Sequence, residues 1–158
     1  MNDEVPVYKF LRTDTYSQFY TTDIVERDWI LDNLYHYELQ GVAFYGAATE
    51  AVDELTGTID VYRFFNTSTG AHFYTGDQAE AAFVQANLDN YIFEGSNFSA
   101  YNTQVEGTVP LYRFYNSQLD THFYTTSTEE RDFYSESPEY VAESGGIAYY
   151  PSFVTFRN

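Results

Sequence analysis

Cysteine is absent from this chain, which excludes a disulfide-stapled scaffold, a thiol nucleophile and a thiolate zinc site. No hydrophobic run approaches the length that spans a bilayer, so membrane insertion is not expected. Basic side chains are also scarce: 7 Lys and Arg stand against 24 Asp and Glu, and the net charge is −17. Nucleic acid and anionic membranes need a basic face, so neither is an expected partner. The charge favours cations or serves solubility alone.

Aromatic residues are abundant, with 17 Tyr and 14 Phe among 158 residues. Disordered chains are poor in aromatics, so the acidic residues belong to the surface of a folded protein. The length suits one domain, residues 1–158, with a substantial core. Tyrosine packs through its ring while its hydroxyl needs a partner, which suits both β cores and surfaces that bind polar, ring-shaped or peptide ligands.

An internal repeat organises the sequence. The stretch LYRFYNSQLDTHFYTT at 111–126 recurs as VYRFFNTSTGAHFYTG at 61–76 and as VYKFLRTDTYSQFYTT at 7–22. The complete repeats span residues 7–45, 61–101 and 111–150, joined by connectors at 46–60 and 102–110. Such self-similarity is typical of folds built from repeated supersecondary units.

Each repeat contains signals for two strands, a short helix and a third strand. Alternating apolar residues around a polar turn predict a hairpin. Asp23, Asp77 and Ser127, each with a glutamate three residues later, predict capping boxes at helix starts. The helical spacing that follows predicts Trp29 and its counterparts Phe83 and Phe133 as core anchors, and Pro138 is expected to shorten the third helix.

A unit of about 40 residues cannot bury its aromatic face alone, so the three units must pack together. We expect a mainly β fold with one short helix per repeat: three tandem ββαβ units closed about a pseudo-threefold axis, β-trefoil-like. Closure also removes exposed sheet edges. A short strand at 153–156 is expected to pair with the beginning of the chain.

The repeats follow the pattern Tyr-Arg-Phe-Tyr-Asn, His-Phe-Tyr-Thr-Thr, Glu-Arg-Asp and Glu-Gly-Val-Ala-Phe-Tyr. This pattern resembles a repeat family of unknown function in secreted microbial proteins, where three copies often accompany extracellular hydrolases or occur in adhesins. The resemblance implies attachment to a cell surface or glycan. Three positions depart from the pattern, Arg12, Gln18 and Ala81, so equivalent sites in all three units are not expected.

The chemistry-bearing residues do not indicate an enzyme. His72 and His122 share one repeat position with Gln18, which makes a poor metal set, and a structural role as buried hydrogen-bond partners is expected. Glu26, Glu80 and Glu130 are explained by helix capping. The sequence shows no asymmetric carboxylate pair, no Gly-x-Ser-x-Gly elbow and no phosphate-cradling loop. No catalytic residue is predicted.

Calcium is a possible cofactor because oxygen ligands are plentiful, although no EF-hand or glycine-aspartate array is present. An irregular site is possible at Asp53-Glu54 or where Asp14 lies beside Asp60.

Ligand-binding candidates are exposed rings on which sugars stack, with neighbouring polar groups that take the hydroxyls. Arg63 and Arg113 serve equally well as internal salt-bridge partners in a chain with few cations. The candidates are Tyr16, Tyr45, Arg63, Asn66, Glu94, Tyr101, Arg113, Asn116 and Tyr150.

We therefore expect a non-catalytic, lectin-like glycan-binding module for surface attachment. A protein- or peptide-binding adhesion module, or a structural spacer, is the alternative. The first four residues lack the regions of a signal peptide and the repeats fill nearly the whole sequence, so we expect a module of a larger secreted protein, extracellular or on a cell surface.

Overall fold

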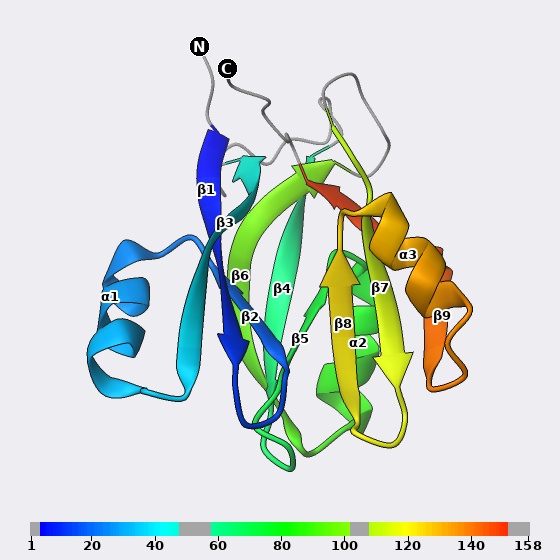
Figure 1. The fold of residues 1–158 in the computed structure, drawn as a ribbon, viewed down its shortest axis with the longest axis horizontal. Helices are drawn as coiled ribbons and strands as arrows, with labels where there is room; N and C mark the ends of the chain where they lie inside the picture. Colours follow the sequence, from blue (N-terminus) through cyan, green and yellow to red (C-terminus); the bar gives the residue numbers. More distant parts are fainter. Residues whose placement is uncertain (1–3, 48–57, 102–107, 152–158) are drawn as a thin grey trace.

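A computed structural model describes residues 4–47, 58–101 and 108–151 of the chain. These segments coincide with the repeats, and each contains two strands, a helix and a third strand in that order, which confirms the predicted ββαβ units (Figure 1). The elements are β1 (Glu4–Arg12), β2 (Gln18–Thr21), α1 (Ile24–Asn33) and β3 (Tyr37–Ala47); β4 (Thr58–Asn66), β5 (His72–Thr75), α2 (Gln78–Asn87) and β6 (Tyr91–Tyr101); and β7 (Leu111–Asn116), β8 (Thr121–Thr125), α3 (Thr128–Ser135) and β9 (Tyr140–Pro151).

Every unit forms its own three-stranded antiparallel sheet, with the first strand in the centre. The strand orders are β2-β1-β3, β5-β4-β6 and β8-β7-β9. In Figure 1 the three hairpin tips point downward, α1 and α3 lie at the two flanks, and α2 lies behind the sheets.

The three sheets are joined edge to edge at only a few positions. Strand β3 pairs with β6 at Ala47 and Ser99, and β6 pairs with β9 at Ala100–Pro151 and Tyr101–Tyr150. The hairpin strands β2, β5 and β8 are only 4 or 5 residues long and pair only with their own central strand. The described residues form no barrel, so the β-trefoil-like architecture expected from the sequence is not confirmed.

One hydrophobic core is shared by all three units. Repeat-equivalent residues fill it: Val7, Val61 and Leu111 from the central strands, Tyr20, Tyr74 and Tyr124 from the hairpin strands, and Phe44 and Phe98 from the last strands. The units are therefore parts of one folded body, as the size of a single repeat requires.

Two core tyrosine hydroxyls connect one unit to the backbone of the unit before it. The Tyr74 hydroxyl accepts a hydrogen bond from the Tyr20 N–H at 2.6 Å and donates to the Tyr20 carbonyl at 2.9 Å. The Tyr124 hydroxyl does the same to Tyr74, at 2.7 and 3.3 Å. Burial raises the pKa of Tyr74 and of Tyr124, so both hydroxyls keep the proton that they donate.

At the contact between units three and one, the Tyr20 hydroxyl donates to the Tyr124 carbonyl at a longer 3.5 Å, and an amide supplies the shorter bonds. Gln18 accepts from the Tyr124 N–H at 2.7 Å and donates to the Tyr124 carbonyl at 3.2 Å. Gln18 occupies the position of His72 and His122, and both of its hydrogen bonds are buried. Its departure from the repeat pattern thus has a structural reason.

The helices begin where the sequence predicts, although the capping glutamates act differently. Asp23, Asp77 and Ser127 are the N-caps and accept from N–H groups of the first turn. The expected return bond from glutamate to the cap N–H is replaced by a threonine: Thr21 Oγ1 accepts from the Asp23 N–H at 3.0 Å and donates to Glu26 at 2.6 Å. The carboxylates of Glu26 and Glu80 point toward the next unit, where they accept from Arg63 and Arg113.

The predicted anchoring role of Trp29, Phe83 and Phe133 is wrong. Their exposed fractions are 55%, 58% and 67%. The next residue along α1 and α2, Ile30 or Val84, is buried instead, because the space beneath the helix already holds the aromatic pair of the hairpin.

The three hairpin tips share one backbone feature. Tyr16, Gly70 and Asp120 occupy the same repeat position and all have positive φ, at 62°, 78° and 53°. The shortening of the third helix predicted from Pro138 is confirmed. Helix α3, which ends before Pro138, has 8 residues against 10 in α1 and α2. The predicted strand at 153–156 and the predicted calcium ligands Asp53-Glu54 lie outside the described residues. Among the described residues, no helix is long and apolar enough to cross a membrane.

Candidate functional site

Two pockets lie at equivalent places between consecutive units. The first interunit pocket, between units one and two, has a volume of about 330 Å³, and the second, between units two and three, about 400 Å³. The first is lined by Arg12, Phe19, Glu26, Trp29, Ile30, Leu34, His36, Tyr37, Arg63, Phe65, His72 and Glu94. The second is lined by Phe73, Glu80, Phe83, Val84, Leu88, Asn90, Tyr91, Tyr115, Asp120, His122 and Glu143.

The first pocket is built over a buried arginine that joins two units. Arg63 donates through Nε to Glu94 at 2.7 Å, and through Nη1 and Nη2 to Glu26 of α1 at 3.1 and 2.9 Å. Its guanidinium carbon lies 4.7 Å from the centre of the Phe19 ring. Burial opposes the charge, but Tyr74, Glu26 and Glu94 raise the pKa of Arg63 above its ordinary value. The cation is permanent.

The same arrangement recurs in the second pocket. Arg113 donates to Glu143 at 2.8 Å and to both oxygens of Glu80 on α2 at 3.0 and 2.9 Å, and it lies 4.8 Å from the Phe73 ring. Two bidentate arginine–carboxylate pairs at equivalent positions hold the units in a fixed relative orientation. The sequence left Arg63 and Arg113 open between a ligand role and an internal ion pair, and the ion pairs are confirmed.

A histidine lies against the outer carboxylate of each cluster. His72 Nε2 lies 3.6 Å from Glu94, and His122 Nε2 lies 3.3 Å from Glu143. Burial, together with Arg63 and Arg12, lowers the pKa of His72 to about 3, so its imidazole is neutral at physiological pH. Although burial would raise the pKa of Glu143, the contacts with His122 and Arg113 lower it, so this carboxylate stays ionised.

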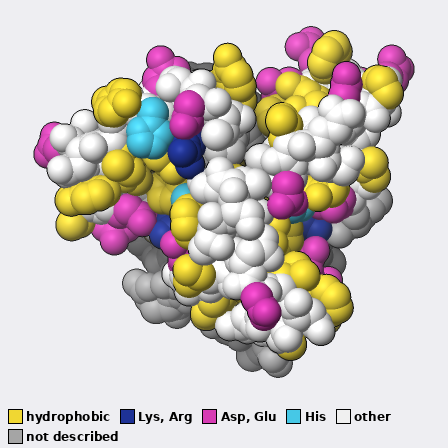
Figure 2. Space-filling view, turned by 90° about the horizontal axis from the view of Figure 1, so that it is seen from below, with side chains coloured by type: hydrophobic (Ala, Val, Ile, Leu, Met, Phe, Trp, Pro, Cys, Tyr) yellow, Lys and Arg dark blue, Asp and Glu magenta, His cyan; other side chains and the backbone are white. Residues whose placement is uncertain are grey.

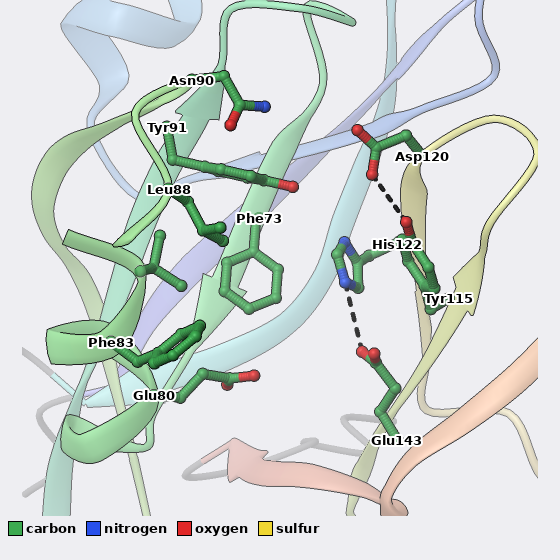
Figure 3. A pocket seen from close by; sticks show the side chains of 11 residues that line it. Phe73, Glu80, Phe83, Leu88, Asn90, Tyr91, Tyr115, Asp120, His122 and Glu143 are labelled. Carbon is green, nitrogen blue, oxygen red and sulfur yellow. Dashed lines mark hydrogen bonds and ion pairs between the residues drawn. The ribbon is translucent and has the colours of Figure 1, made fainter. Parts of the chain in front are cut away.

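Each pocket opens beside an exposed ring of the helix, Trp29 in the first and Phe83 in the second. Figure 3 shows Phe83 and Glu80 on one wall of the second pocket and Tyr115, His122 and Glu143 on the other, with Phe73 between them. On the face seen in Figure 2, hydrophobic and acidic side chains share the surface, and the few Lys and Arg side chains lie in recesses.

The family model of a domain of unknown function (DUF5648) matches residues 6–152 of the chain. The chain belongs to the DUF5648 family. Neither a curated protein nor a solved structure is found to match it.

The interface between units three and one of this DUF5648 chain is built differently. The pocket there, of about 270 Å³, is lined by Lys9, Gln40 and Glu130 where the other two have arginine and two glutamates. Burial lowers the pKa of Lys9, against the effect of Glu130. Phe133, the equivalent of Trp29, does not line this pocket.

The predicted asparagines are buried in the hairpin turns and not in the pocket walls. The side-chain oxygen of Asn66 accepts from the Ser68 N–H at 2.9 Å, and its amide donates to Asp120 at 3.1 Å. Asn116 accepts from two N–H groups of its own turn, those of Gln118 and Leu119 at 3.0 and 3.1 Å. Of the predicted ligand-binding residues, Arg63 and Glu94 line the first pocket. Arg113 lies behind the second pocket, where it binds the lining residues Glu143 and Glu80.

The predicted tyrosines lie outside both pockets. Tyr16 is 73% exposed at a hairpin tip. Tyr45 is half-buried opposite Pro6, and its repeat equivalent is Ser99, so it forms no set with Tyr101. Tyr150 pairs with Tyr101 through the backbone, and its side chain lies outside the described residues.

The two aspartates of the suggested calcium site, Asp14 and Asp60, each contact a different partner. Asp14 pairs with Arg12 at 2.8 Å, and Asp60 accepts from the Ser96 hydroxyl at 3.0 Å. Among the described residues, no three His, Asp or Glu side chains form a group suited to a metal ion.

Sequence reasoning missed the placement of Trp29, Phe83, Glu26, Glu80 and Glu143 at the pockets. A signal for the glutamates exists, because Arg63 and Arg113 recur at one repeat position and each has two glutamates at equivalent repeat positions. No sequence signal shows that the helix rings face solvent.

Proposed function

We propose that this protein is a non-catalytic, lectin-like module that binds glycan in its two interunit pockets. The observation that supports this is the repeated pairing of an exposed helix ring, Trp29 or Phe83, with a buried and fixed arginine–glutamate cluster. Both volumes lie in the range of about 300–1,000 Å³ that holds small ligands.

The parts of each pocket match what a sugar ring needs. The C–H face of a pyranose stacks on an aromatic ring, and its hydroxyls donate to carboxylate oxygens. Glu26 and Glu94 are held by Arg63 before any ligand arrives, so ordering them adds no cost on binding. Mostly apolar walls with a few fixed polar groups are typical of small-molecule sites.

The same arginine–glutamate clusters do not favour glycoside hydrolysis. A glycosidase needs one carboxylic acid that carries a proton to the leaving group. In both pockets the two carboxylates bind one permanently charged arginine, and the pKa of Glu143 is lowered. Lowering the pKa opposes the protonated form, so these residues suit binding and not acid catalysis.

We also propose that the three units close about a pseudo-threefold axis, trefoil-like in plan. The contacts of Tyr74 with Tyr20, of Tyr124 with Tyr74, and of Gln18 with Tyr124 run from each unit to the next and back to the first. Closure explains why a helix ring of one unit and a hairpin of the next share each pocket. The surface location and the larger secreted parent protein belong to this proposal as well.

The test is a glycan array on the purified domain, in calcium and again in chelator, followed by calorimetry on any hit. Trp29→Ala and Phe83→Ala each remove one stacking ring, and losing about 1.4 kcal/mol lowers the affinity of that pocket about tenfold. Phe133→Ala is the matched control, because Phe133 is equally exposed but lines neither pocket.

The double variant should weaken binding at both pockets about tenfold, while Phe133→Ala leaves it unchanged. Loss of glycan binding in chelator would indicate that calcium is part of the site. An array without hits in either buffer, or equal loss in the control, would refute glycan binding at these pockets.

A protein or peptide partner is the second candidate, because the exposed rings Trp29 and Phe83 beside carboxylates also fit a basic side chain. Capture of a partner that survives deglycosylation would favour this adhesion role. A spacer role would be supported if the double variant retained every attachment.

A further inference from the structure

The two interunit pockets differ most at the hairpin tip that closes them. In the first pocket the tip residue is Gly70, and the guanidinium of Arg12 takes the space of its missing side chain: a Cβ on Gly70 would lie 2.1 Å from Arg12 Nη1. Arg12 donates to the Gly70 carbonyl at 3.0 Å and lines the pocket. Arg12 also pairs with Asp14 at 2.8 Å, so an arginine–aspartate ion pair stands at this mouth.

In the second pocket the same two positions carry Asn66 and Asp120. Asp120 accepts from the Asn66 amide at 3.1 Å and from the Tyr115 hydroxyl at 2.9 Å (Figure 3). Both donors are neutral, and among the described residues no Lys, Arg or His forms an ion pair with Asp120. A carboxylate without an ion-pair partner among the described residues therefore stands at this mouth.

The exchange changes the charge of the whole pocket. Counting Arg, Asp and Glu together with the ion-pair partners of each lining residue, Arg12 and Arg63 face Glu26, Glu94 and Asp14 in the first pocket, which leaves a net charge of −1. In the second, Arg113 faces three carboxylates, those of Glu80, Asp120 and Glu143, which leaves a net charge of −2. Partly buried charges are screened little by salt, so this difference acts on a bound ligand.

The aromatic walls of the second pocket add to its preference for a cation. Tyr91 and Tyr115 lie near Asp120, and Phe83 lies at the wall of α2 (Figure 3). Ring faces attract ammonium groups, most strongly where water is excluded. Rings together with a carboxylate are the groups that recognise an organic ammonium ion.

We propose that the second interunit pocket selects an amino sugar with a free, charged amine, that Asp120 is the residue that selects it, and that the first pocket, with Arg12 at its mouth, accepts only uncharged sugars. This inference rests on the proposed glycan binding and adds the ligand class of one pocket. A sugar is favoured over a simple amine because the pocket, at about 400 Å³, has room for a ring beside Phe83.

The experiment titrates glucosamine and N-acetylglucosamine, which differ in the charge of one nitrogen, near pH 6, where an amine of this kind is protonated. Calorimetry reports total binding. Trp29 is the only tryptophan of the chain and lines the first pocket, so its fluorescence reports that pocket alone.

Asp120→Asn removes the charge and keeps the shape, and asparagine tolerates the positive φ of 53° at this tip. Asp132→Asn is the control, since Asp132 lies on α3, is 68% exposed and lines neither pocket. Replacing a charge-assisted hydrogen bond by a neutral one lowers affinity about tenfold.

We expect glucosamine to bind without a change in Trp29 fluorescence, and Asp120→Asn, unlike Asp132→Asn, to weaken it about tenfold. N-acetylglucosamine should be unaffected by either change. Equal glucosamine affinity in the wild type and Asp120→Asn, or quenching of Trp29 by glucosamine, would overturn the inference and leave glycan binding standing.

Binding of lysine amide that depends on Asp120, with no sugar bound on the whole array, would overturn both the inference and the proposed function.

Discussion

Replacing Tyr74 by phenylalanine tests how the three units hold together. The hydroxyl is fully buried and makes two hydrogen bonds to the backbone of Tyr20, at 2.6 and 2.9 Å. The Tyr20 carbonyl keeps a donor in Arg63 Nη1 at 3.4 Å, whereas the Tyr20 N–H loses the acceptor at 2.6 Å. The change therefore removes both hydrogen bonds of the hydroxyl, including the 2.6 Å bond accepted from the buried Tyr20 N–H.

A net hydrogen bond contributes about 1 kcal/mol, and a buried donor that loses its partner costs about 1–3 kcal/mol. We expect Tyr74→Phe to lower the free energy of unfolding by about 2–4 kcal/mol. For a chain of 158 residues this corresponds to a fall in Tm of roughly 5–12 °C. Urea denaturation followed by tyrosine and tryptophan fluorescence measures it as a lower midpoint with an unchanged slope.

Tyr16→Phe is the control, because its hydroxyl belongs to a side chain that is 73% exposed, and such changes stay within about 0.5 kcal/mol. Tyr124→Phe should match Tyr74→Phe, since its hydroxyl makes the same pair of bonds at 2.7 and 3.3 Å. If Tyr74→Phe were as stable as Tyr16→Phe, the hydroxyl contacts would not hold the units together.

Two further predictions concern single positions. The free energy of unfolding should fall below pH 6.5 by up to about 1.4 kcal/mol per pH unit. The reason is that His72 takes up a proton in the unfolded chain, whereas its pKa in the folded protein is lowered to about 3. His72→Gln should flatten this slope in urea titrations between pH 6.5 and about 4, and an unchanged slope would contradict the prediction. Gly70→Ala should lose about 1 kcal/mol more than Gly95→Ala, because both have positive φ but only Gly70 has Arg12 in the way of a Cβ; equal losses by thermal denaturation would show that the contact with Arg12 contributes nothing.

The elements were predictable because their signals are local. A hairpin and an N-cap such as Asp23 each depend on a few consecutive residues, and each signal occurs in all three repeats. The arrangement of the sheets was not predictable in the same way. The β-trefoil-like expectation came from the repeat number, whereas the strand order depends on which edge of each sheet the returning strand reaches.

The pockets escaped prediction because their residues meet only between units. Glu26 has a sufficient local explanation as a helix-capping residue, yet its carboxylate binds Thr21 and Arg63. Trp29 and Ile30 both fit an apolar helical stripe, and the spacing alone cannot decide which one turns inward. The space under α1 is filled by Phe10 and Phe19, so the smaller side chain enters and the large ring remains at the surface.

The unequal interfaces explain why the repeat pattern breaks in unit one. Lys9, Gln18 and Gln40 replace an arginine, a histidine and a glutamate at positions far apart in sequence, yet all three face unit three. Lys9 cannot make the planar, bidentate contacts that Arg63 and Arg113 make, and Gln40 carries no charge for it to pair with. Gln18 meanwhile binds the Tyr124 backbone. Because of these three residues, the ring-and-cluster arrangement is present only at the other two of the three described interfaces.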